Sequence, residues 1–227
     1  MTLDGLFYAA GILAMISILM VKSIKETLVE RQSFKWSIFR LRKDEFFEVN
    51  VLPVAMVMFL SAACSGILFV LSPDLSSYLG IENKGWFFMF YVISTISVRL
   101  TIGKLSDKIG RRKSLIIGMG FLIISMLMVA YATDVFSYTA ASIVFGVATG
   151  INSPTLFAWM ADLSPVHRRG IGSGTLFISL ELGILFGSAS TLFIYDSTYE
   201  SVFYVFLYGA SLASLAMTYL IWHLVRR

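Results

Sequence analysis

The chain has 227 residues, of which 57% are hydrophobic and only 14% carry a charged side chain, with a net charge of +4. Soluble domains are about 45–50% apolar and about 25% charged. This composition, with a mean hydropathy of +0.81, excludes a soluble globular protein and predicts an all-α membrane protein. The single cysteine, Cys64, lies in an apolar run and excludes a framework of disulfides.

Seven segments are long and apolar enough to cross a bilayer, which takes about 20 residues of helix. These predicted transmembrane helices cover residues 5–21, 50–72, 86–105, 114–132, 135–160, 169–194 and 200–224. They divide the chain into a leading transmembrane helix (1–21), a basic cytoplasmic loop (22–49) and a six-helix transmembrane bundle (50–227).

The loop from 22 to 49 contains one stretch with a helical pattern. Trp36, Phe39, Lys43 and Phe46 recur there at near-helical spacing, with other basic residues between them. That composition is typical of a helix lying in the plane of the lipid headgroups. A solvated linker explains the same residues equally well.

Basic residues gather in alternate loops of this arrangement. The first loop, the turn after the third helix, the turn after the fifth helix and the C-terminus hold nearly all of them, whereas the opposite loops hold Lys84 alone. The opposite loops carry acids instead: Asp4, Asp74, Glu82, Asp134, Asp196 and Glu200. Because short cytoplasmic loops are rich in lysine and arginine, we expect a multi-pass protein of the cell inner (plasma) membrane with its N-terminus outside and its C-terminus in the cytoplasm.

The turn after the third helix has the most distinctive sequence of the chain. Residues 99–113 read RLTIGKLSDKIGRRK, in which one acid, Asp107, is surrounded by basic residues. Glycine at positions 103 and 110 lets backbones approach closely and lets the chain leave a helix with positive φ. This pattern between two apolar runs predicts a hinge at the membrane surface.

The spacing of Gly103, Asp107 and Gly110 with the following basic residues closely resembles the signature loop of the major facilitator superfamily. In that family two six-helix halves are joined by a long cytoplasmic loop, and the signature turn follows the second helix of each half. The chain therefore resembles the sixth helix, the central loop and the seventh to twelfth helices. The segments KETL (25–28) and RRG (168–170) also resemble family sequences of the central loop and of the turn between the tenth and eleventh helices.

The resemblance implies that the signature turn belongs to a gating motif. Its members are Arg99, Gly103, Asp107, Lys108, Gly110, Arg111 and Arg112. In this interpretation Arg99 pairs with Asp107 or with a helix end and releases it as the protein changes its open side. The alternative is an arginine whose charged end reaches the membrane interface while its stem lies in lipid.

Glu181 is the acid that lies well inside a predicted span, in the sequence FISLELGILFG. An ionised carboxylate in mid-membrane costs about 2.5 kcal/mol or more, so the side chain should face a cavity or another helix. We identify Glu181 as the candidate for proton coupling, and the resemblance supports this because an acid followed by glycines occurs near this point of the eleventh helix. The alternative is a carboxyl group that only bonds a neighbouring helix.

Seven residues are candidates for lining a substrate cavity: Phe59, Phe69, Tyr91, Asn152, Pro154, Phe157 and Phe177. The aromatic ones lie on helices that the resemblance equates with cavity-lining helices, and packing or contact with lipid is their alternative role. Pro154, after Asn152, should kink its helix and free backbone carbonyls near the cavity. The pairs Gly146 with Gly150 and Gly183 with Gly187 predict seams of close helix packing.

These observations predict a secondary active transporter that moves a small organic molecule by alternating access. Proton-coupled efflux is the preferred interpretation. Proton symport of a nutrient or metabolite and a truncated, non-transporting remnant are the alternatives. A seven-helix receptor leaves the signature turn unexplained, and the last predicted helix lacks a lysine that could hold retinal.

The expected partners are a small-molecule substrate, protons, the lipid bilayer, and either a missing N-terminal half or a second copy. No nucleophile with an adjacent base, phosphate-binding loop or metal-ligand spacing occurs in the sequence. We therefore expect no enzymatic activity, no cofactor and no metal. The basic loops are explained by the membrane, so we expect no nucleic acid.

Overall fold

The computed structural model describes residues 3–21, 47–102 and 105–225 of the chain. Contacts divide the chain into two units, residues 1–41 and residues 42–227. In the first unit the described part is helix α1 (Leu3–Val21), which is apolar after Asp4. The interfacial helix that the sequence suggests around Trp36 to Phe46 lies outside the described residues.

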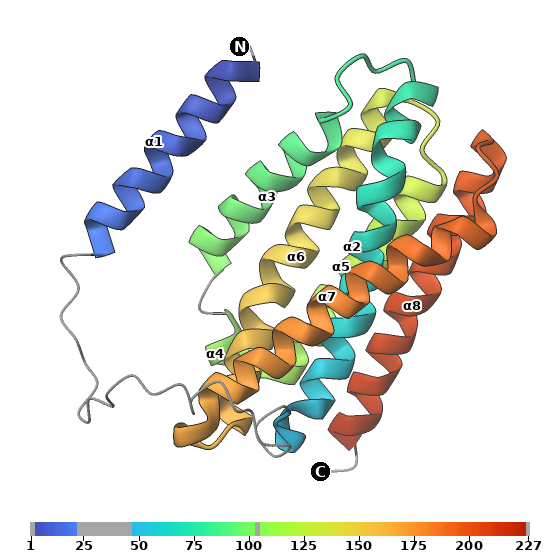
Figure 1. Ribbon diagram of the computed structural model, residues 1–227. Helices are drawn as coiled ribbons and strands as arrows, with labels where there is room; N and C mark the ends of the chain where they lie inside the picture. The colour runs from blue at the N-terminus through green and yellow to red at the C-terminus, as the bar shows by residue number, and fades with distance from the viewer. Residues whose placement is uncertain (1–2, 22–46, 103–104, 226–227) are drawn as a thin grey trace. The chain divides into compact units, whose positions relative to one another are not determined.

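The second unit is a bundle of helices (Figure 1). Its α-helices are α2 (Leu52–Tyr78), α3 (Trp86–Ile102), α4 (Leu105–Ile109), α5 (Arg111–Ala130), α6 (Val135–Leu163), α7 (Arg169–Ile194) and α8 (Tyr199–Val225). Two short 3₁₀ helices, η3 (Val49–Val51) and η4 (Val166–Arg168), precede α2 and α7.

The prediction of an all-α membrane protein is confirmed. The described residues contain helices and no strand, and five of the helices (α2, α5, α6, α7 and α8) are long and apolar enough to span a bilayer. Two further predicted spans correspond to shorter apolar helices, Phe7–Val21 and Trp86–Thr101. In hydrocarbon a helix is favoured because it pairs every backbone polar group within one segment.

Close helix crossings hold the bundle together, and glycines make them possible. Helix α2 packs on α7 and α8, α5 packs on α6 and α8, and α3 packs on α6. A Cβ atom on Gly187 would lie 2.0 Å from the Ala63 carbonyl oxygen of α2. A Cβ on Gly146 would lie 2.6 Å from the Tyr91 carbonyl oxygen of α3. The predicted glycine seams are therefore confirmed as helix contacts.

Polar side chains lock three of the helices at one end of the bundle. Tyr138 of α6 is fully buried, and its hydroxyl lies 2.7 Å from Ser72 Oγ of α2. The ring of Phe87, at the start of α3, packs against it with ring centroids 5.1 Å apart. Helix α6 begins with a capping box, in which the Asp134 carboxylate accepts from the backbone N–H of Ser137. These contacts fix the relative register of α2, α3 and α6, which carry most of the candidate site.

Two helix ends differ from the sequence prediction. Helix α2 continues to Tyr78, beyond the predicted end at residue 72, although Pro73 lies inside it. Proline removes one helical hydrogen bond, but the polar residues that follow have partners elsewhere: Asp74 accepts from the Tyr195 hydroxyl at 2.8 Å. Helix α3 ends at Ile102, and α4 follows it as a separate helix. Gly110 then has φ of 93°, which confirms the expected positive φ between α4 and α5.

Candidate functional site

A groove of about 200 Å³ opens between α2, α3, α6 and α7. We call it the central groove. Its lining residues are Met58, Ser61, Ala62, Ser65, Phe69, Tyr91, Arg99, Leu122, Thr149, Asn152, Ser153, Leu156, Leu180 and Ile184. Ligand sites of whole proteins usually measure about 300–1,000 Å³, so this groove has the size of part of a site.

The structure brings most of the predicted cavity residues together. Phe69, Tyr91 and Asn152 line the central groove. Pro154 and Phe157 line an adjoining hollow of about 390 Å³, which shares Arg99 and Ser153 with the central groove.

Two of the predicted cavity aromatics lie beside or away from the groove. Phe177 of α7 packs on Phe157, with ring centroids 5.2 Å apart. Phe59 does not line the central groove: it lies in a different hollow with Leu182 and Tyr219. Its backbone carbonyl is the surface on which Gly183 packs, so Phe59 belongs to the α2–α7 crossing.

Arg99 is the charged residue of the central groove. Its Nη2 atom donates a hydrogen bond to Ser153 Oγ at 3.3 Å, which joins α3 to α6. The register is fixed one turn earlier, where Thr95 Oγ1 donates to the Gly146 carbonyl at 3.2 Å. Within the described residues Arg99 forms no ion pair. The predicted contact with Asp107 is not formed in this structure; Asp107 instead pairs with Arg111.

Asn152 is buried in the wall of the groove, with 4% of its surface exposed. Its Oδ1 atom has no hydrogen-bond partner in the described part of the chain, and its Nδ2 atom has only Met119 Sδ, at 3.9 Å. The side chain fits because residue 118 is glycine: a Cβ there would lie 1.9 Å from Asn152 Oδ1. Buried amides normally have partners, so this one has spare capacity to bind another group.

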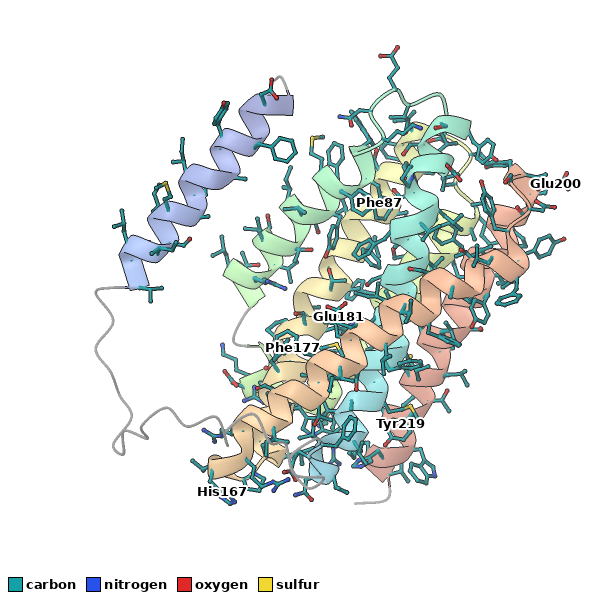
Figure 2. The ribbon with its side chains drawn as sticks, viewed as in Figure 1. Phe87, His167, Phe177, Glu181, Glu200 and Tyr219 are labelled. Atoms are coloured by element: carbon teal, nitrogen blue, oxygen red, sulfur yellow. The ribbon has the colours of Figure 1, made fainter. Side chains whose placement is uncertain are left out.

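Glu181 lies midway along α7, near the centre of the view in Figure 2. Its side chain is exposed and, within the described part of the chain, forms no hydrogen bond or ion pair. On either side of it along α7, Leu180 and Ile184 line the central groove. Glu181 therefore stands beside the groove and is not tied to a neighbouring helix.

The signature turn is fastened to α6 and α8 by its arginines. Arg111 forms an ion pair with Asp107 and a second with Asp162 of α6, in which Nε lies 2.9 Å from Oδ2. Arg112 donates to the His223 carbonyl of α8 at 3.2 Å and lies over the ring of Trp159. Of the other members of the predicted gating motif, Lys108 is exposed, Gly110 separates the two helices, and Gly103 lies outside the described residues.

Sequence reasoning missed one buried ion pair, between Glu48 and Arg168. Glu48 is 4% exposed, its carboxylate pairs with Arg168, and its backbone N–H donates to Thr175 Oγ1 at 2.9 Å. The hydrogen bond from Arg168 holds the pKa of Glu48 below its ordinary value. The segment before α2 is thereby attached to the start of α7. The sequence feature that could have indicated this ion pair is the position of Glu48, an acid at the end of a basic loop and next to an apolar run.

Within the described residues no three His, Cys, Asp or Glu side chains gather as metal ligands would. The central groove is instead lined by an arginine, an amide, several hydroxyl groups and apolar side chains. Such a surface can bind and orient a small molecule by hydrogen bonds and apolar contact.

Comparison with known proteins identifies the family. The sequence model of the Major Facilitator Superfamily matches residues 54–227, which is most of the chain and includes every residue of the central groove. The chain belongs to the Major Facilitator Superfamily. It is thus a multi-pass integral membrane protein of a family of transporters.

Curated relatives in this superfamily have different printed roles. The chain is 26% identical over 162 residues to the putative metabolite transport protein YwtG of Bacillus subtilis, covering 65% of this chain and 34% of that protein. It is 28% identical to a D-xylose transporter of Levilactobacillus brevis, covering 47% and 23%. It is 30% identical to the MFS efflux transporter aclA of Aspergillus oryzae, covering 61% and 25%. The matched part thus spans about a third or less of the length of each relative.

Proposed function

We propose that this superfamily chain is part of a secondary active transporter of the plasma membrane that moves a small organic molecule by alternating access. The central groove is its share of the substrate site. The observation that carries the proposal is the position of the groove: polar groups from α2, α3 and α6 converge there among long apolar helices. The buried Asn152 amide lacks a full set of hydrogen-bond partners, which is unusual for a buried amide and is explained if it binds substrate.

The transport is proposed to be coupled to protons through Glu181. A carboxylate halfway along an apolar helix is costly when ionised, and here no described residue bonds it. Proton uptake and release are the simplest way to relieve that cost during a cycle. Coupled efflux is the first form of the proposal. Symport is the second candidate, because a D-xylose transporter and an efflux transporter both stand among the relatives.

The proposed partner is a missing N-terminal half or a second copy of the chain. The central groove is smaller than usual ligand sites, and Glu181 and Phe177 lie exposed on α7 beside it (Figure 2). A second six-helix unit facing this surface would enlarge the groove and enclose the carboxylate. In the proposed cycle the two units rock about the shared site, with the N-terminus of this chain outside and its C-terminus in the cytoplasm.

The test uses the full chain, purified in mild detergent with any polypeptide that accompanies it, in vesicles that contain a trapped pH-sensitive dye. Addition of compounds from a metabolite panel should cause proton movement that the empty vesicles lack. Glu181→Gln should abolish this movement, whereas the matched control Glu200→Gln, at an exposed helix end, should leave it unchanged. Coupling that persists at wild-type strength in Glu181→Gln would remove the proposed role of this carboxylate.

The gating motif is tested in the same vesicles. Asp107→Asn weakens the attachment of Arg111, so we expect turnover to fall severalfold while the concentration for half-maximal transport changes little. Asp4→Asn, on the exposed surface of α1, is the control. Normal turnover of Asp107→Asn would contradict a gating role.

A further inference from the structure

Arg99 differs from Arg111 and Arg168 in the kind of partner it has. Arg111 and Arg168 are each bound by carboxylates, whereas Arg99 has a single hydrogen bond, to the uncharged Ser153 hydroxyl. A guanidinium group carries five N–H donors and cannot lose its charge. Most of the binding capacity of Arg99 is therefore unused by the described residues.

The position of this cation is set by the α3–α6 contact. Ser94 Oγ donates to the Ile143 carbonyl at 2.8 Å, and Gly150 of α6 allows Val98 of α3 to pack closely against it. Arg99 follows Val98 directly and faces Ser153. The backbone of Arg99 is consequently fixed beside the groove, and its exposed side chain is directed to α6 by the hydrogen bond to Ser153.

Asn152 is an independent indication of a ligand at the same place. It is adjacent in sequence to Ser153, lines the groove, and is more than nine-tenths buried with its Oδ1 unpaired in the described part of the chain. An unpaired buried polar group costs about 1–3 kcal/mol. Its Oδ1 atom now lies against Gly118 of α5, and a ligand with a hydroxyl or N–H group in the groove would give this amide a partner when its side chain turns toward the groove.

The rest of the lining supplies apolar surface and neutral hydroxyls. Phe69 and Tyr91 contribute aromatic rings, Thr149 contributes a hydroxyl, and none of the residues that line the central groove or its adjoining hollow is acidic. On α7 the lining residues are Leu180 and Ile184. Glu181 stands next to them but forms no ion pair with Arg99 within the described part of the chain.

From this arrangement we infer that the substrate is an organic anion. Its carboxylate, or a similar group, binds Arg99 together with the Ser153 hydroxyl. A second polar group of the substrate bonds the Asn152 amide, and an apolar body lies against Phe69 and Tyr91. The chemical reason is that a planar guanidinium matches a carboxylate with two parallel hydrogen bonds.

This inference rests on the proposed function, because it names the substrate class of the proposed site. Its test uses trios of probes with one body and three end groups, such as 3-phenylpropionate, its amide and the corresponding amine, within a panel of aliphatic and aromatic acids. Binding to the detergent-purified full chain is measured by calorimetry. We expect the carboxylate member of a trio to bind more tightly than its amide or amine.

Arg99→Gln should weaken carboxylate binding about 10- to 100-fold, which is the size of a charge-assisted hydrogen bond, and should leave amides unchanged. The matched control is Arg169→Gln, an exposed arginine at the start of α7. Asn152→Asp, nearly equal in shape, should also disfavour carboxylates by placing an acidic group in the groove that Arg99 lines. It keeps the test valid if Arg99→Gln folds poorly. A folded chain that binds only amides or amines, or an Arg99→Gln variant with unchanged carboxylate affinity, overturns the inference.

Transport measurements separate this failure from failure of the proposed function. If the vesicles move neutral or cationic members of the panel and not acids, the transporter proposal stands and the anion inference is wrong. If acids bind in an Arg99-dependent way but no compound of any class crosses the membrane, the inference on ligand class stands and the transport proposal is wrong.

Discussion

A single methyl group added at Gly187 should weaken the crossing of α2 and α7. The new Cβ atom would lie 2.0 Å from the Ala63 carbonyl oxygen, and contacts under 3.0 Å are essentially never observed for real Cβ atoms. The obstructing atom belongs to the backbone of a packed helix, so it cannot rotate away. One turn earlier Gly183 meets the Phe59 carbonyl in the same way, at 2.4 Å. Helix α7 therefore cannot relieve the clash by a small shift toward that residue.

The magnitude follows from a comparison with Gly174 on the same helix, which has nothing within 4 Å of its added Cβ. Replacing glycine with alanine in a helix gains up to about 1 kcal/mol of helix propensity, and this gain applies to both variants. Their difference isolates the clash, at about 1–3 kcal/mol for overpacking. For a chain of this size that corresponds to an unfolding temperature about 2–12 °C lower in Gly187→Ala than in Gly174→Ala.

The chain contains its own probe for this measurement. Cys64 is the single cysteine and is fully buried in α2 next to Ala63. A thiol-reactive dye should therefore label it only as the bundle unfolds, in detergent and on heating. If Gly187→Ala and Gly174→Ala are labelled at the same temperature, the helices do not approach as closely as the structure describes.

Three further predictions concern single contacts. Glu48 has a pKa below its ordinary value of 4.5 because Arg168 binds its carboxylate, so the stability that this pair contributes is complete above pH 4.5 and is lost as the pH falls through the lower pKa of the folded state. The unfolding temperature of wild type should therefore fall in acid by more than that of Glu48→Gln, and the control Glu200→Gln should behave as wild type. Parallel pH profiles of wild type and Glu48→Gln would contradict the pairing. Gly118→Ala should reduce ligand affinity by displacing the Asn152 amide, because the new Cβ would lie 1.9 Å from Asn152 Oδ1. The control Gly120→Ala, with open space around its Cβ, should bind normally. Equal affinities of the two variants would show that the amide does not contact the ligand. Asp162→Asn should change the free energy of unfolding by only about 1 kcal/mol or less, because its side chain is 53% exposed in the pair with Arg111; a much larger loss in denaturant titration would mean that the pair is shielded from water.

The positions of the helices could be predicted because their cause is local. An apolar run of about 20 residues has few alternatives to a helix in lipid, and the runs at 135–160 and 169–194 correspond to α6 and α7. The end of α2 could not be predicted in the same way. The predicted span ends at residue 72, but the helix continues through Pro73 to Tyr78, and Tyr195, more than a hundred residues away, bonds Asp74 in this last part.

The candidate site shows the same division between local and distant causes. Tyr91, Phe69 and Asn152 could be proposed from their helices, and the structure places them in one groove. Phe59 could not be told from them by sequence, because the side of α2 that meets α7 depends on where Gly183 and Gly187 allow a close approach. Asp162, the second carboxylate partner of Arg111, and Glu48, the partner of Arg168, also come from distant segments, which no local pattern identifies.

If both proposals hold, Glu181 links the charge of the substrate to the direction of coupling. Leu180 and Ile184 line the groove on either side of this residue. In the proposed cycle the charge of Glu181 repels an anion bound at Arg99, and uptake of a proton by Glu181 removes that repulsion. Proton and anion should then bind cooperatively. Cooperative binding is the requirement for symport, whereas efflux by exchange requires competition. For an organic anion this arrangement corresponds to symport, the second candidate under the proposed function: carboxylate affinity should rise as the pH is lowered in wild type and stay constant in Glu181→Gln. An affinity that falls on acidification in wild type alone would instead support exchange.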